Sequence, residues 1–197
     1  MTPNGPRPLR LLGIAGSLRE RSYNRALLRT AEALAPDGVE IERFDLAGLP
    51  LYNGDLDSDE RRPEPVERLK AALAAADGLL VATPEYNHTV PGVLQNAVDW
   101  ASRPARRSPL AGKPIGMMGA APGTVGTARA QEHLKLTLLS TLALVHPHPG
   151  VLVGQARDKF DADLRLTDAR TRDFLAAFLA DFADWVRQVQ PEPAEAA

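Results

Sequence analysis

The chain has 197 residues, of which 44% are hydrophobic, 24% are charged and none is cysteine. This is the composition of an ordinary globular protein and excludes a collagen-like or wholly disordered chain. The lack of Cys excludes disulfides, thiolate metal sites and cysteine nucleophiles. Lys and Arg number 23 against 25 Asp and Glu, so the basic balance of a nucleic-acid-binding protein is absent.

Runs of apolar residues alternate with amphipathic stretches along the chain. In chain order they predict a strand at 9–15, a helix at 24–34, a strand at 39–44, a helix at 63–76, a strand at 78–82, a helix at 93–101, a strand at 114–118, a helix at 124–142, a strand at 151–153 and a helix at 167–189. Strict alternation predicts an α/β fold with three layers, namely a doubly wound, five-stranded parallel sheet of order 2-1-3-4-5 between helices.

The sequence also predicts where the protein is found and how it is divided. No run approaches the roughly 20 apolar residues of a membrane span, and the apolar run near the amino terminus is too short for a signal peptide. We therefore expect a cytoplasmic protein with no membrane partner. One domain is expected over residues 8–190, between loose tails at 1–7 and 191–197.

The strand order predicts a ligand crevice outside the carboxyl ends of the strands, in the loops after the first, third and fourth strands. The first of these loops, 16–24, holds two serines, an asparagine and two arginines before a helix, and this favours a phosphate. It contains neither G-x-G-x-x-G nor G-x-x-x-x-G-K-[ST], which argues against a dinucleotide pyrophosphate and a P-loop. The alternative is a helix capped by Ser22 or Asn24, with solvated arginines.

The other two loops suit a flat ligand. In the loop 83–92, two prolines add stiffness, and Tyr86, Asn87 and backbone amides can hold the edge of a heterocycle. The loop 119–127 consists of small residues that let a ring approach the backbone closely. The alternative for the loop 83–92 is a plain turn with a buried tyrosine, and the alternative for the loop 119–127 is a flexible turn.

Further candidates carry less weight. The segment 49–53 is either a lid beside the crevice or an ordinary loop. His146 and His148 alternate with prolines, so we expect a surface loop rather than a helical metal-binding pair, and we expect no metal site. No G-x-S-x-G motif supports nucleophilic hydrolysis.

Several short motifs occur in order along the chain. They are Gly16-Ser17-Leu18-Arg19 with Ser22 and Asn24, Leu49-Pro50-Leu51-Tyr52, Thr83-Pro84-Glu85-Tyr86-Asn87, Val90-Pro91-Gly92, Asn96-Ala97-Val98-Asp99-Trp100, Ala111-Gly112-Lys113-Pro114 and Gly126 with Ala128-Arg129. Together they resemble the NADPH-dependent FMN reductase family of flavodoxin-like proteins, which includes quinone, azo-dye and chromate reductases. The resemblance extends over roughly residues 9–190. It implies a flavodoxin-like fold with bound FMN and a homodimer or homotetramer.

The resemblance also implies which residues bind the cofactor. The FMN phosphate maps onto Ser17, Arg19, Ser22 and Asn24, the isoalloxazine ring maps onto Pro84, Glu85, Tyr86 and Asn87, and the third loop contributes Ala120, Ala121, Gly123 and Gly126. Family members often have Ser where this chain has Ala120 and Ala121. That difference removes a side-chain hydrogen bond to the ring and leaves only backbone amides to reach it.

The expected function is that of an FMN-dependent NAD(P)H oxidoreductase. A hydride passes from NADPH or NADH to flavin N5 and then, in a ping-pong cycle, to a small acceptor such as a quinone, free flavin, azo dye or metal oxyanion. No residue is assigned as a catalytic acid, base or nucleophile. One alternative is a non-enzymatic flavin-binding electron carrier or redox sensor, against which the net charge of −2 argues. Another is a scaffold for a different phosphate metabolite, which leaves Pro84 and Tyr86 unexplained.

Overall fold

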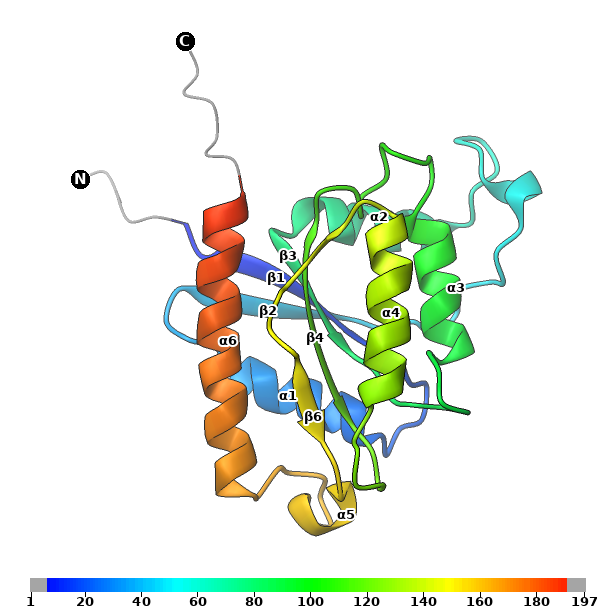
Figure 1. Cartoon of the computed structure of the whole chain (residues 1–197). Helices are drawn as coiled ribbons and strands as arrows, with labels where there is room; N and C mark the ends of the chain where they lie inside the picture. Colours follow the sequence, from blue (N-terminus) through cyan, green and yellow to red (C-terminus); the bar gives the residue numbers. More distant parts are fainter. Residues whose placement is uncertain (1–6, 191–197) are drawn as a thin grey trace.

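A parallel sheet forms the middle layer of the protein, with helices on both faces (Figure 1). The computed structural model describes residues 7–190. The strands are β1 (Leu9–Ala15), β2 (Val39–Phe44), β3 (Gly78–Ala82), β4 (Pro114–Ala120), β5 (Leu144–Val145) and β6 (Val151–Val153). They run in the order β2-β1-β3-β4-β5, with every pair parallel, and β6 also pairs with β4. The predicted three-layer fold, with a parallel sheet of order 2-1-3-4-5, is confirmed.

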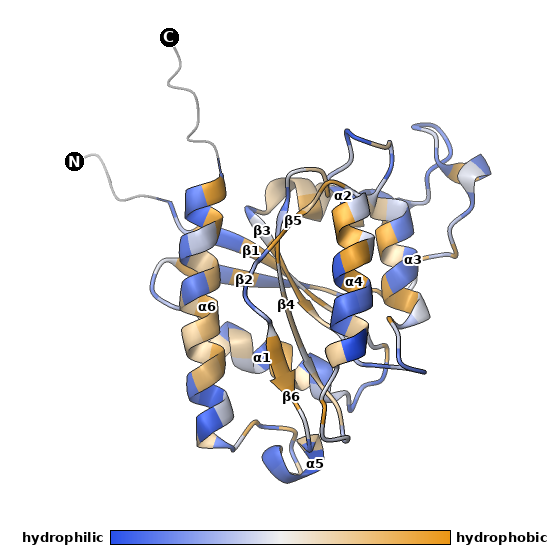
Figure 2. Cartoon of the chain, viewed as in Figure 1, coloured by the Kyte–Doolittle hydropathy of each residue, from blue (hydrophilic) through white to orange (hydrophobic). Residues whose placement is uncertain are grey.

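The helices divide between the two faces of the sheet. They are α1 (Tyr23–Ala33), α2 (Glu64–Ala75), α3 (Gly92–Ala101), α4 (Ala128–Ser140), α5 (Ala156–Lys159) and α6 (Ala169–Val189), with a short 3-10 helix η1 (Gly54–Leu56). Helices α1 and α6 pack on one face, and α2, α3 and α4 pack on the other. Successive strand residues point to opposite faces, so Leu11 joins one core and Leu12 joins the other. Figure 2 shows the apolar strand β6 lying between α6 and α4.

Most predicted boundaries agree with the structure to within two residues. The amino end of α4 is the exception, because the helix begins at residue 128 rather than 124. Gly126 has a φ of +64°, a left-handed conformation that an α-helix cannot contain. The small residues before α4 therefore form a loop.

The fifth strand position is split between β5 and β6, and the sequence predicted only β6. Pro147 and Pro149 lie between the two pieces and have no N–H to donate to a sheet. The expectation of a surface loop here is wrong for His146, which is only 4% exposed. Its ring packs against Trp185, with 4.9 Å between the ring centroids, and against Phe182.

A buried carboxylate joins both ends of the described chain at the amino edge of the sheet. Asp77 accepts hydrogen bonds from Arg7 Nη1 and Nη2 at 2.7 and 2.6 Å and from the backbone N–H of Arg10 at 2.8 Å. Gln190 Nε2 donates to the backbone oxygen of Asp77 at 2.6 Å. Burial alone would raise the pKa of Asp77, but the bonds from Arg7 and Arg10 outweigh it and hold that pKa below its usual value. The predicted tails, 1–7 and 191–197, lie outside the described residues except for Arg7.

We expect Asp77→Asn to lower the free energy of unfolding by about 2 kcal/mol, because the charged acceptor of these bonds becomes neutral. The control is Asp163→Asn, which removes a carboxylate whose ion pair with Arg165 lies in solvent, and it should change the value by less than about 0.5 kcal/mol. Urea denaturation measures both variants. Equal losses in the two would contradict the special role of Asp77.

Candidate functional site

Three loops at the carboxyl edge of the sheet enclose a cleft of about 300 Å³. They are the loops after β1, β3 and β4, in which the sequence predicts the ligand site. Nine of the twelve predicted site residues line the cleft: Ser17, Arg19, Ser22, Asn24, Pro84, Glu85, Tyr86, Ala120 and Ala121. Asn87, Gly123 and Gly126 are not among the lining residues, whereas Tyr23, Pro122 and Arg157 line the cleft and were not predicted.

The first loop leads directly into the amino end of α1. Ser22 is the N-cap, as one interpretation of the sequence proposed, and its Oγ accepts from the N–H groups of Asn24 at 3.2 Å and Arg25 at 3.4 Å. Its hydroxyl hydrogen remains available to a ligand. Arg19 Nε donates to the backbone oxygen of Arg21 at 3.1 Å. The loop therefore presents hydroxyl groups, positive charge and a helix N-terminus to the cleft.

The side chain of Asn24 joins the first loop to the third. Its Nδ2 donates to the backbone oxygen of Ala120 at 2.9 Å, and its Oδ1 accepts from the Ala120 N–H at 2.9 Å. Asn24 is buried, so these bonds satisfy an amide that has no access to water. Both polar atoms of its side chain are thus already paired within the protein.

The second loop contains a tight two-residue turn. Tyr86 N–H donates to the Thr89 oxygen at 3.2 Å, and Thr89 N–H donates back to the Tyr86 oxygen at 3.0 Å. The residues between them, Asn87 and His88, have φ angles of +52° and +64°. Positive φ at both central positions is the geometry of a type I′ turn, which favours Asn. The turn holds the half-exposed Tyr86 ring at the cleft, with Oη 3.5 Å from Ser17 Oγ.

Glu85 ties the second loop to the first turn of α4. Its Oε2 accepts from the N–H groups of Arg129 at 3.0 Å and Ala130 at 3.2 Å, and its Oε1 lies 3.4 Å from Arg129 Nη1. The helix's own N-cap, Thr127, makes no side-chain capping bond, so Glu85 supplies one from outside the helix. Burial by itself would raise the pKa of Glu85, but these bonds and the nearby His88 hold that pKa below its usual value.

The third loop is paired with the end of β6 and the start of α5. Ala121 N–H donates to the Val153 oxygen at 3.0 Å, and the Ala121 oxygen accepts from Ala156 at 3.1 Å. The Ala120 N–H is bonded to Asn24. The amides of Ala120 and Ala121 are therefore already paired within the protein, although both residues line the cleft.

The loop after β2 is fixed to α3. The backbone oxygen of Pro50 accepts from Asn96 Nδ2 at 2.9 Å and from Trp100 Nε1 at 2.8 Å, and Tyr52 N–H donates to Asn96 Oδ1 at 2.8 Å. Leu51, between these anchored residues, is 82% exposed. The segment is an ordinary anchored loop in this structure, and none of residues 49–53 lines the cleft.

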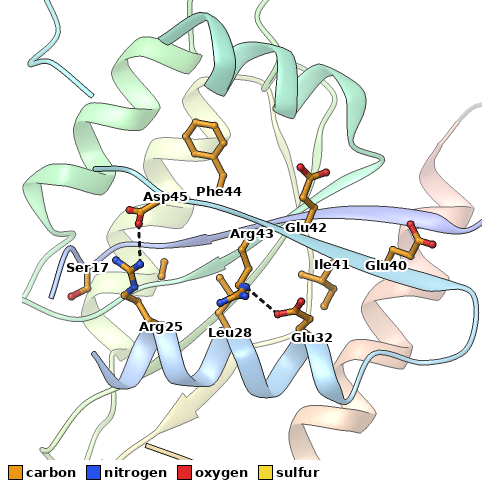
Figure 3. Close-up of a pocket in the computed structure, with 11 residues that line it drawn as sticks. Ser17, Arg25, Leu28, Glu32, Glu40, Ile41, Glu42, Arg43, Phe44 and Asp45 are labelled. Carbon is orange, nitrogen blue, oxygen red and sulfur yellow. Dashed lines mark hydrogen bonds and ion pairs between the residues drawn. The ribbon is translucent and has the colours of Figure 1, made fainter. Parts of the chain in front are cut away.

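Figure 3 shows a second, larger hollow of about 560 Å³ between α1 and β2. Arg25 pairs there with Asp45 at 2.9 Å, and Arg43 pairs with Glu32 at 3.0 Å. These two ion pairs are neutral, Glu40 and Glu42 add negative charge to the lining, and the hollow follows an edge strand. We therefore place the candidate site in the smaller cleft, where three loops meet and which shares Ser17 with this hollow.

Residues 7–190 show neither a metal-binding cluster nor a membrane-spanning helix. No cluster of three or more His, Cys, Asp or Glu side chains in this part of the chain could hold a metal ion. None of the helices described has the length and apolar character needed to cross a membrane.

The lowered pKa of Glu85 predicts a pH-dependent contribution to stability. A carboxylate whose pKa is depressed by folding stabilises the protein above its usual pKa, and the contribution is lost as the pH falls through the depressed value. We expect Glu85→Gln to lower the free energy of unfolding by about 1 kcal/mol at pH 7. Well below about pH 4, the variant and the unmodified protein should have the same free energy of unfolding. Urea denaturation at both pH values is the measurement. The control is Glu132→Gln, which changes an exposed carboxylate on α4, the helix to which Glu85 is bonded. It should have little effect on the free energy of unfolding at either pH.

The sequence matches the family described as NADPH-dependent FMN reductase over residues 9–158, a range that includes all three loops. The chain is 46% identical over 184 residues to an NAD(P)H-dependent FMN reductase of Pseudomonas aeruginosa, covering 92% of this chain and 97% of that protein. It is 40% identical over 179 residues to a 2-hydroxy-1,4-benzoquinone reductase of a Burkholderia species, covering 91% of this chain and 97% of that protein.

Solved structures agree with these sequence matches. The flavoenzyme NAD(P)H:acceptor oxidoreductase of Paracoccus denitrificans superposes with a TM-score of 0.82 at 36% identity, covering 91% of this chain and 98% of that one. Fold, cleft position and sequence therefore point to the same group of proteins. This chain belongs to the NADPH-dependent FMN reductase family.

Proposed function

We propose that this protein is an FMN-dependent oxidoreductase that takes electrons from NADPH or NADH and gives them to a quinone or similar small acceptor. The cleft between the three loops carries the proposal, since it lies in the matched family range and at the edge where doubly wound sheets hold their ligands. Bound FMN would supply the chemistry, which is hydride acceptance from NAD(P)H followed by transfer of two electrons to the acceptor.

The phosphate end of the cofactor is assigned to Ser17, Arg19 and Ser22. Ser17 is only 4% exposed, yet its Oγ has contacts no shorter than 3.4 Å, so its hydroxyl is free to donate to a phosphate oxygen. The positive end of the α1 dipole and Arg19 favour an anion at the same place. The role of Asn24 is to hold α1 against β4 so that these groups stay together.

The ring end is assigned to Pro84, Tyr86 and the backbone of Asn87. In the tight turn, the N–H of Asn87 has no acceptor within residues 7–190, and it can donate to the edge of a flat heterocycle. Ala121, which is partly exposed, adds apolar surface to the cleft. Glu85, through α4, fixes the second loop in place, while the positive φ of Gly126 lets the third loop turn into α4.

We also propose that the protein acts in the cytoplasm as a homodimer or homotetramer. The outer surface of α4 supports an assembly, because Leu136 is 68% exposed, and Leu139 and Leu142 are exposed near it. Grouped apolar side chains of this kind are typical of protein interfaces. The lack of cysteine fits a reducing compartment.

An absorption spectrum of the purified protein mixed with FMN, taken before and after anaerobic NADPH, tests the function. We expect bound-flavin bands that bleach with NADPH and return when a benzoquinone is added. A variant with alanine at Ser17, Arg19 and Ser22 tests the assigned phosphate site and should bind FMN weakly. Bands that persist after NADPH would instead favour an electron carrier or sensor, and a failure to bind FMN would refute the proposal.

Replacement of Asn87 tests whether this residue serves the cofactor through its backbone. Asn87→Gly keeps the N–H and suits a positive φ, so we expect the Kd for FMN to stay within about twofold. Asn87→Ala strains the turn and should lower the free energy of unfolding by about 1 kcal/mol. Flavin fluorescence titration and urea denaturation are the measurements. A tenfold loss of affinity in the glycine variant would show that the side chain itself binds.

A further inference from the structure

The cleft includes an arginine that sequence reasoning did not select. Arg157 lies on α5, directly after the fifth strand position, and it is one of the residues that line the cleft. Its side chain is exposed and makes no hydrogen bond or ion pair with any of residues 7–190. The guanidinium therefore has all of its donors available for a ligand.

Several contacts fix α5 beside the amino end of α1. The ring of Phe160, just after α5, packs on the ring of Tyr23, the first residue of α1, with 5.2 Å between centroids. Arg21 Nη2 donates to the Ala162 oxygen at 2.7 Å. Ala156 N–H donates to the Ala121 oxygen at 3.1 Å. Arg157 therefore lies on a segment that is held against the first and third loops.

This position places Arg157 at one particular end of the cleft. Tyr23 follows the capping serine of the first loop, where the helix N-terminus and the hydroxyl groups are found. Pro84 and Tyr86, which the proposed function assigns to the ring, line the cleft from the loop after β3. Arg157 is therefore on the side that the proposed function assigns to phosphate.

The charges in the cleft also favour an anion at this end. The lining contains two arginines and one carboxylate, and that carboxylate, Glu85, is bonded to the amino end of α4. Arg19 is bonded to a backbone oxygen of its own loop. Arg157 is thus the arginine of the lining with an uncommitted planar fork, which matches two oxygens of a phosphate group.

We propose that Arg157 is a second arginine for the phosphate monoester of FMN and sets the preference of the cleft for FMN over riboflavin. The proposal rests on the proposed function, since it assumes that a flavin occupies the cleft. The same phosphate monoester chemistry is present in the 2′-phosphate of NADPH, but the position of Arg157 beside the amino end of α1 favours the flavin phosphate.

Titration of the flavin-free full chain with FMN and with riboflavin tests the proposal, with fluorescence as the readout. We expect Arg157→Ala to raise the Kd for FMN by about tenfold or more and to leave the Kd for riboflavin within about twofold. Arg157→Lys should restore part of the loss, because it returns the charge without the fork. Arg165→Ala is the matched control, since it removes an exposed arginine from the next hairpin outside the cleft, and it should change neither Kd.

Different failures overturn different statements. Equal weakening of FMN and riboflavin by Arg157→Ala would mean a structural role and would overturn the assignment. An unchanged Kd of Arg157→Ala for FMN would also overturn the assignment. If this variant at the same time had a lower ratio of kcat/KM for NADPH to kcat/KM for NADH, Arg157 would be reassigned to the 2′-phosphate of NADPH. An unmodified protein that binds neither flavin would overturn the proposed function itself.

Discussion

The position of β1 in the sheet is the constraint on which the site depends. Because β1 pairs with β2 on one side and with β3 on the other, the chain winds outward in two opposite directions from the same place. Helix α1, which follows β1, lies on one face, and α3, which follows β3, lies on the other. The loops after β1 and β3 must diverge, and the cleft occupies the space that this divergence leaves.

Long-range polar bonds then fix the loops to one another before any ligand arrives. Asn24 links the first loop to the end of β4, and Glu85 links the second loop to the start of α4. Each bond joins residues that are far apart in the chain, so losing either side chain would affect two loops together. A cleft held in this way loses little conformational entropy on binding, which favours affinity.

Much of this could be predicted from the sequence, because a buried parallel sheet requires continuous apolar runs and its order determines which loops meet. The loops of the cleft followed from that reasoning, and the family resemblance of their motifs indicated most of the lining residues. The roles of Asn24 and Glu85 did not, since an amide or carboxylate beside a helix suits a cap, a ligand and a long-range tether equally well. Arg157 has no motif around it, and β5 has only two residues before the chain meets Pro147.

The bonds around Asp77 have a practical consequence for the use of the protein. Arg7 and Gln190 both bond to Asp77, at the amino edge of the sheet, while the cleft lies beyond the carboxyl ends of the strands. The two points at which the described chain begins and ends are thus on the side opposite the cleft (Figure 1). Tethering the protein to a resin or an electrode at a position beside Arg7 or Gln190 would leave the cleft facing the solution.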